Sequence, residues 1–177
     1  MRLTVIALSL FCSSILVTSA VAAQPVAVPQ FDSVGLRGSG EVRIRHGNRQ
    51  QVIIRSGSVA VSEITVERGG SLQIRTCRTF CPSGYRLEVD IVTPRIGDLA
   101  VSGSGALIVG SGFAPAASRS IAINGSGMID ASALSMSEAE VAVSGSGRVR
   151  AGAMRRLQAA VSGSGHIGYA GRPEVQS

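Results

Sequence analysis

The side chains best suited to chemistry in this sequence are two pairs of carboxylates that alternate along short apolar segments. Glu88 and Asp90 form one pair, and Glu138 and Glu140 form the other. Alternation places both members on one face of a β-strand, and paired carboxylates act as acid and base or nucleophile in enzymes that cleave polysaccharides. Acidic residues are few and scattered, however, and each pair is also typical of a solvated strand. A polysaccharide-acting enzyme is therefore the alternative hypothesis, and no catalytic residue is assigned.

A serine-rich tetrapeptide, Ser-Gly-Ser-Gly or a close variant, recurs five times. The copies are Arg37–Gly40, Ser102–Gly105, Asn124–Gly127, Ser144–Gly147 and Ser162–Gly165. No histidine stands at a fixed distance from these serines, so the repetition indicates a structural role and not a nucleophile. A phosphate-binding loop would need a helix after the glycines, whereas apolar alternation follows each copy. We therefore expect no nucleotide cofactor.

The charge of the chain gives no clear sign of a nucleic-acid partner. The formal net charge is +6 and all 17 basic residues are arginine, spread along the sequence. Such a spread is typical of the solvated faces of strands, with a basic stripe for anionic polymers as the alternative. Aromatic residues make up 3% of the chain, too few to provide stacking platforms for bases.

Two cysteines, Cys77 and Cys81, lie beyond the N-terminal apolar segment. An even number of cysteines in an exported chain favours a disulfide. A metal site would need more ligands, and the only two histidines are isolated in the sequence, so we predict no metal. The disulfide would close a small loop. The polar and aromatic residues in and beside this loop are the candidate ligand-binding residues: Arg78, Phe80, Tyr85 and Arg86.

The N-terminal sequence predicts export. Arg2 precedes an apolar run from Leu3 to Val17, and small residues follow at 19–23. This pattern is typical of a secretory signal peptide, and the run is short for a membrane span. We predict no transmembrane span and a location in the periplasm, at the cell surface or outside the cell. The predicted segments are a signal peptide over 1–23, a linker over 24–30, one β-domain over 31–169 and a tail over 170–177.

The repeated tetrapeptides also predict the architecture. In the last four copies the first glycine is residue 103, 125, 145 and 163, which gives steps of 22, 20 and 18 residues. In all five copies the positions four and two residues before this glycine, and four and six residues after it, are apolar. Alternation on both sides of a recurring glycine corner is typical of a solenoid, with unrelated turns of a β-sandwich as the alternative. We predict an all-β solenoid of about six to seven coils around aliphatic columns.

Two parts of the chain are less regular. The 65 positions from Gly38 to Gly103 give room for about three further coils, with a tight turn at 68–71. Ser132 to Glu140 has a weak helical pattern, and we expect no more than a turn there. The tail, with Pro173 and its charges, would cap one end of the stack, and self-association is the alternative cap.

The segment from Phe31 to Ile44, the run from Leu99 to Gly105 and the later Ser-Gly-Ser-Gly copies together resemble the bacterial auto-transporter adhesin, head GIN domain family. The resemblance covers residues 31–169. It implies an exported, right-handed, single-stranded parallel β-helix with a role at the cell surface. It supplies no catalytic or ligand-binding residues.

These observations together favour an exported, non-enzymatic β-solenoid that presents a binding surface, as an adhesin or a cell-envelope interaction protein. We expect this surface on a sheet face or in the loop from Cys77 to Tyr85, with an unidentified envelope or extracellular ligand. The alternatives are the polysaccharide-acting enzyme and a structural envelope component that works by self-association as a homo-oligomer.

Overall fold

The computed structural model describes residues 23–177, which form strands and no helix. The all-β class is therefore confirmed for this range. The signal peptide predicted over 1–23 lies outside the described residues, except for Ala23. The strands are β1 (Gln24–Val26), β2 (Ser33–Gly38), β3 (Gly40–His46), β4 (Gln51–Ser56), β5 (Glu63–Glu67), β6 (Ser71–Arg75), β7 (Leu87–Thr93), β8 (Leu99–Gly103), β9 (Ala106–Val109), β10 (Ala116–Gly125), β11 (Met128–Gly145), β12 (Arg148–Ala153), β13 (Arg156–Gly163), β14 (His166–Ala170) and β15 (Glu174–Gln176).

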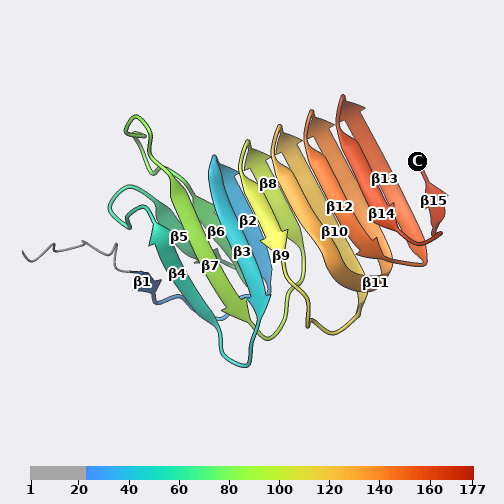
Figure 1. Cartoon of the computed structure of the whole chain (residues 1–177), viewed down its shortest axis with the longest axis horizontal. Coiled ribbons are helices and arrows are strands. Elements are labelled where there is room, and N and C mark those ends of the chain that lie inside the picture. Colours follow the sequence, from blue (N-terminus) through green and yellow to red (C-terminus); the bar gives the residue numbers. More distant parts are fainter. Residues whose placement is uncertain (1–22) are drawn as a thin grey trace, which may run out of the picture.

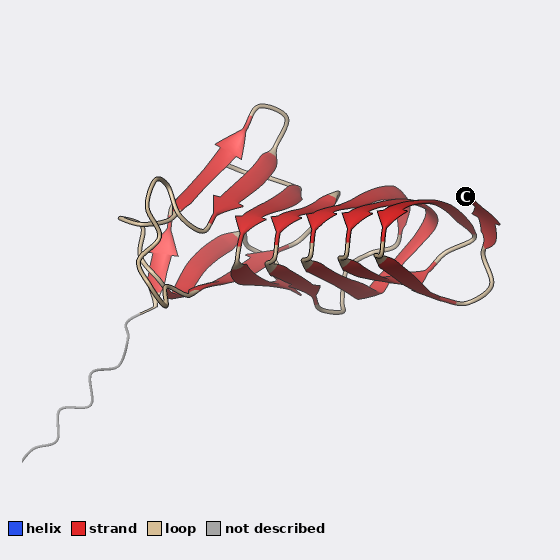
Figure 2. Ribbon diagram, turned by 90° about the horizontal axis from the view of Figure 1, so that it is seen from above, coloured by secondary structure: helices blue, strands red, loops and turns tan. Residues whose placement is uncertain are grey.

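The strands form one mixed sheet that folds back on itself and nearly closes around the core, so that two layers face each other (Figures 1 and 2). The parallel part of layer A consists of β7, β3, β9, the first part of β11, β12 and β14. The parallel part of layer B consists of β6, β2, β8, β10, the second part of β11, β13 and β15. The chain crosses between the layers at every glycine-marked corner.

The glycine-marked corners lie in register along layer B. The first glycines pair in the order Gly38, Gly103, Gly125, Gly145 and Gly163, and their φ angles lie between 108° and 123°. A Cβ atom added to Gly145 would lie 2.5 Å from the carbonyl oxygen of Gly125. Glycine is thus required both by the left-handed backbone and by the close approach of the next strand. The predicted stacking of glycine on glycine is confirmed.

The apolar positions on each side of these corners point into the core, as the alternation predicts. In layer B, for example, the column Leu36, Val101, Ile123 and Val143 is at most 2% exposed. Burying each such side chain stabilises the fold by roughly 1.5–3 kcal/mol. The column ends at Val161 in β13, which is 48% exposed.

The expectation of three coils between the first and second copies is wrong. Strand β2 pairs directly with β8, with Leu36 opposite Val101, although the two strands are far apart in sequence. The intervening chain adds one parallel rung, in which β6 pairs with β2 and β7 with β3. It also adds antiparallel pairs at the N-terminal end, β4 with β7, β1 with β4 and β5 with β6. Of these pairs, β5 with β6 is a hairpin, which needs only a short turn, whereas a parallel rung needs a full circuit. The predicted tight turn at 68–71 joins β5 to β6, where the amide of Gly70 donates to the carbonyl of Glu67.

Three shorter segments also form strands. Residues 132–140, expected to be a turn, lie inside β11, whose pairing with β12 is irregular between Ala131 and Ser135. Strand β11 passes from layer A to layer B there, and Leu134 and Met136 are buried. Strand β1 falls within the predicted linker and pairs with β4, and β15 falls within the predicted tail and pairs with β13.

We expect Gly145→Val to lower the free energy of unfolding by about 3 kcal/mol, because it combines backbone strain with a clash against Gly125. Thermal or chemical denaturation followed by circular dichroism measures the loss. Gly171→Val is the matched control, since Gly171 also has a positive φ but an added Cβ meets nothing within 4 Å. If both variants lose the same stability, the close approach at the corner contributes nothing.

Candidate functional site

The predicted disulfide loop is present and projects from the N-terminal half of the molecule. Cys77 and Cys81 form a disulfide, with their Cα atoms 5.4 Å apart. The loop leads from the end of β6 to the start of β7. Phe80 is 79% exposed, the highest value among the exposed large hydrophobic residues of the described chain. Arg78 and Arg86 are also exposed.

Tyr85, the fourth predicted binding residue, is half-buried and has a different role. Its hydroxyl accepts a hydrogen bond from the amide of Ser58 at 2.8 Å and lies 2.7 Å from the hydroxyl of Ser62. Ser62 is buried and donates to the carbonyl of Thr76 at the end of β6. Tyr85 therefore fastens residues 57–62 to the base of the disulfide loop. The four predicted residues are close in sequence, but the structure separates an exposed set from a structural anchor.

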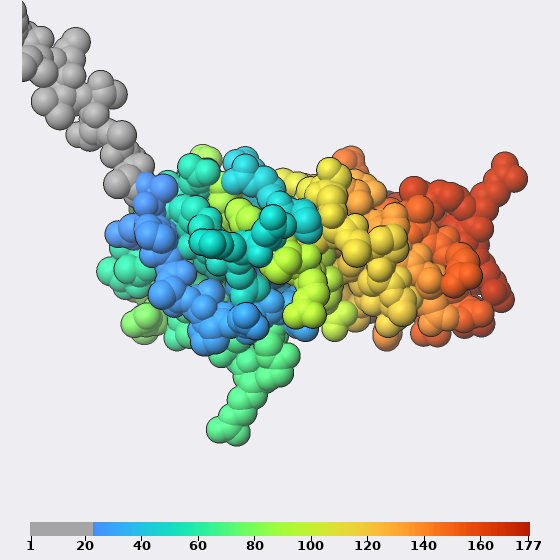
Figure 3. Space-filling view, turned by 90° about the horizontal axis from the view of Figure 1, so that it is seen from below, coloured from blue at the N-terminus to red at the C-terminus, as the bar shows by residue number. Residues whose placement is uncertain are grey.

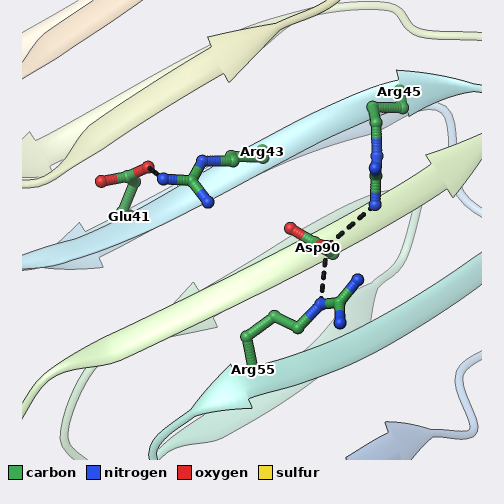
Figure 4. Close-up of polar contacts among 5 residues, drawn as sticks. All are labelled: Glu41, Arg43, Arg45, Arg55 and Asp90. Atoms are coloured by element: carbon green, nitrogen blue, oxygen red, sulfur yellow. Dashed lines mark hydrogen bonds and ion pairs between the residues drawn. The ribbon is translucent and has the colours of Figure 1, made fainter. Parts of the chain in front are cut away.

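One member of each predicted carboxylate pair, Asp90 and Glu138, is engaged in ion pairs. Asp90 is 6% exposed and accepts hydrogen bonds from Arg45 at 2.9 Å and Arg55 at 2.8 Å (Figure 4). Glu138 pairs with Arg156 on the neighbouring strand. Among residues 23–177, no group of three or more His, Cys, Asp and Glu side chains could hold a metal ion.

The outer face of layer B contains a hollow of about 520 Å³ that crosses the strands. Its floor is formed by the residue three positions before each first glycine, and all of these are glycine or alanine: Gly35, Ala100, Ala122, Ala142 and Ala160. A second column runs beside it, one position before each glycine: Arg37, Ser102, Asn124, Ser144 and Ser162. The hollow exists because small side chains stand in register on adjacent strands.

Sequence reasoning missed the small-residue column, although the signal was present. Alignment of the five copies on their first glycine marks the positions that face the core, and the positions between them face outward. The residue three before the glycine is always Gly or Ala. The four polar residues of the second column, from Ser102 to Ser162, are all exposed, so their hydroxyl and amide groups are available to a ligand.

Two smaller hollows continue this face. The second hollow is lined in part by Ala142 and Ala160, which also line the first. The second and third hollows have Glu140 and Gln158 in common. The last hollow, of about 320 Å³, brings together Asp98, Glu138 and Glu140 with Arg119 and Arg156. It lies toward the strand ends opposite the glycine corners. The three hollows together form a strip on the outer face of layer B. The strip is neutral in its centre and carries carboxylates near the strand ends opposite the glycine corners.

Arg119 lies beneath this strip and is 4% exposed. Its guanidinium donates to the backbone carbonyls of Ile96, Gly97 and Ala114. Burial lowers the pKa of Arg119, and the charge of Asp98 raises it part of the way back. Arg119 therefore holds two connecting loops against the core, and its hydrogen-bonding groups face the protein and not the solvent.

Comparison with known proteins identifies the family. The family described as "putative auto-transporter adhesin, head GIN domain" matches residues 30–116 and 108–173. The chain belongs to this family. No curated protein matches it, and the described part of the chain contains no helix long and apolar enough to cross a membrane.

Solved structures similar to this head GIN domain protein share its fold. A "putative adhesin" from Parabacteroides distasonis ATCC 8503 is 16% identical, with a TM-score of 0.67 over 84% of this chain and 64% of that chain. A "putative lipid binding protein" from the same organism is 18% identical, with a TM-score of 0.57 over 83% of this chain and 72% of that chain. A "putative adhesin" from Bacteroides fragilis NCTC 9343 is 16% identical, with a TM-score of 0.56 over 88% and 91%.

We expect Tyr85→Phe to lower the free energy of unfolding by about 1–2 kcal/mol, because the amide of Ser58 loses its acceptor and the hydroxyl of Ser62 loses one of its two partners. Hydrogen exchange of residues 57–62 should quicken in the same variant. Phe80→Ala is the control, and the exposure of Phe80 predicts unchanged stability. Equal stability of both variants would contradict the anchoring role of Tyr85.

Proposed function

We propose that this protein is an exported, non-enzymatic binding domain whose layer B presents its outer face to an extended polysaccharide of the cell envelope. The observation on which the proposal depends is the hollow of about 520 Å³, which spans layer B from β6 and β2 to β13. At roughly 4.8 Å per strand, columns in register offer repeated, evenly spaced polar groups. A polymer with repeating hydroxyl groups is the class of ligand that fits such a surface.

The proposed architecture is a right-handed, single-stranded parallel β-helix of about six to seven coils, extended by antiparallel strands at one end. The parallel pairing of both layers and the regular glycine corners support it. The proposed segments are the signal peptide over 1–23, the linker over 24–30, the binding domain over 31–169 and the tail over 170–177.

Export to the periplasm or the cell surface is supported by the apolar N-terminal run and by the disulfide between Cys77 and Cys81. Disulfides persist in oxidising compartments and are rare in the cytosol. Adhesion is supported by family membership and by the description "putative adhesin" given to two of the similar structures. A polysaccharide ligand in the envelope is compatible with either location.

The disulfide loop provides a second proposed contact through Arg78, Phe80 and Arg86. Arginine and an exposed aromatic ring can bind the charged and the apolar parts of an envelope ligand. Tyr85 belongs to this loop region but acts through its hydrogen bonds to Ser58 and Ser62.

We expect Ala142→Arg to weaken binding to purified peptidoglycan at least 10-fold, because a long charged side chain would stand in the hollow. Co-sedimentation of the mature protein with peptidoglycan measures the affinity. The matched control is Ala106→Arg, an outward position of layer A outside this hollow. The same assay with an Arg78→Ala, Arg86→Ala double variant tests whether the disulfide loop contacts the ligand, in which case binding weakens. Unchanged binding by Ala142→Arg, or no binding by the unaltered protein, would overturn the proposed surface.

The hollow lined by Asp98, Glu138 and Glu140 favours a second candidate function, a polysaccharide-cleaving enzyme. Two carboxylates in one groove are the minimum that glycoside hydrolysis needs. Asp98, however, accepts a hydrogen bond from the amide of Ser120 at 2.8 Å, and Glu138 pairs with Arg156.

Release of reducing ends from peptidoglycan distinguishes the two candidates. The binding proposal predicts no release by the unaltered protein, because Asp98 and Glu138 already have protein partners and Glu140 alone cannot supply both carboxylates. Release that Glu140→Gln abolishes and Glu41→Gln on layer A preserves would establish the enzyme instead.

A further inference from the structure

The two ends of the molecule are built differently. Figure 3 shows the N-terminal segments gathered at one end of the long axis and the C-terminal segments at the other. At the N-terminal end the outermost strands are β1 and β5, each paired on one side only. Pro25 lies in β1, and Glu63 and Glu67 lie at the two ends of β5. Proline and charged side chains are the usual means by which proteins prevent an edge strand from pairing with another chain.

At the C-terminal end only the short strand β15 has such protection, from Pro173 before it and Glu174 within it. Strand β14 pairs only with β12, and β15 pairs only with residues 156–158 of β13. The rest of β13, Ala159–Gly163, is unpaired on its outer side among the described strands. Strand β14 reads His-Ile-Gly-Tyr-Ala, without proline, arginine or a carboxylate. Its outer backbone groups therefore form an open template for another strand.

The same end also exposes the apolar columns of the core. Three of the five exposed large hydrophobic side chains of the described chain are there: Val161 (48%), Tyr169 (45%) and Val175 (45%). Each continues a buried column, because Val161 stacks on Val143, Tyr169 on Ala151 and Val175 on Leu157. Open backbone and exposed core side chains coincide at one place, which is the pattern of an unfilled interface.

We infer that this C-terminal end binds the same end of a second copy of the chain, in a closed two-fold dimer. The two-fold axis runs parallel to the strands, so layer A of one copy continues into layer B of the other. Strand β14 of one copy then lies beside β15 of the other, and the two strands run antiparallel. Tyr169 then lies opposite Val175 of the second copy, and both side chains face the joined core. Because β14 carries no charged side chain, its pairing with β15 opposes no like charges at the edge.

Self-pairing is favoured over a different partner because the two free edges complement each other. Each copy offers one open strand in layer A, β14, and one short strand in layer B, β15. The two-fold axis generates the pairing of β14 with β15 of the other copy twice, once in each layer. Each layer therefore continues from one copy into the next through one such pair of strands. A head-to-tail contact would instead place this end against β1 and β5, where Pro25 and the glutamates oppose pairing.

The size of the end predicts a weak affinity. Strands of five to eight residues at about 3.3 Å per residue, in layers about 10 Å apart, give an end face of roughly 170–260 Å² per copy. That area lies below the range of tight protein interfaces, so we expect dissociation in the high-micromolar to millimolar range. This inference does not depend on the binding surface proposed for layer B, because it rests on the open strands β14 and β15, which do not line the hollow of about 520 Å³.

Sedimentation velocity of the mature protein across a concentration series from micromolar to millimolar tests the inference. We expect a monomer–dimer equilibrium that closes at the dimer. Val175→Lys and Tyr169→Lys should each weaken the dimer at least 10-fold, and Val175 lies in the short terminal strand, so its replacement leaves the domain folded. Phe80→Lys is the matched control, since it places the same charge on an exposed apolar residue elsewhere, and it should leave the dimer unchanged.

Three results would overturn the inference. The first is a monomer at every concentration, and the second is a dimer that withstands Val175→Lys and Tyr169→Lys while both variants retain the native circular dichroism spectrum. The third is assembly that continues beyond the dimer, because only a head-to-tail contact can extend without closing.

Discussion

The structure depends on the close approach of backbone to backbone at the glycine-marked corners. A side chain on Gly145 would lie 2.5 Å from the carbonyl oxygen of Gly125, and the same contact recurs from Gly125 to Gly103. No other residue can occupy these corners, so each strand has one permitted alignment with the next. A shift of one residue would turn the buried side chains outward, and the corners exclude that shift.

Fixed alignment makes the two outer faces chemically different. On layer B, small residues and Ser or Asn repeat at the same two positions and merge into continuous columns. On layer A, the outward residues vary and form separate ion pairs, such as Arg43 with Glu41 and Arg150 with Asp130. Exposed ion pairs of this kind add little to stability. Hydrogen bonds from Ser132 lower the pKa of Asp130 more than the charge of Arg150 does. Layer B is therefore the face with a regular pattern to offer a repetitive ligand.

Much of the fold could be predicted from the sequence, because alternation on both sides of a repeated glycine defines which residues face inward. The pairing of β2 with β8 could not, because alternation does not reveal which strand is the neighbour. Residues 132–140 contain Ala, Leu and Met, which favour a helix, yet pairing with β10 and β13 holds them extended. The small-residue column was readable from the same alignment. The roles of Tyr85 and Arg119 were not, because their hydrogen-bond partners come from loops distant in sequence.

The direct contact of β2 with β8 has a consequence for the order in which the native state assembles. Rungs from β8 to β13 join strands about one repeat apart. The two neighbours of β2 follow 38 residues later in β6, from Ser33 to Ser71, and 65 residues later in β8, from Gly38 to Gly103. Closing these longer loops costs more chain entropy, and synthesis from the N-terminus produces β2 before either neighbour exists. Among the glycine-marked strands, β2 is thus synthesised first but is among the last to pair. The regular C-terminal rungs therefore form the template on which the N-terminal strands assemble.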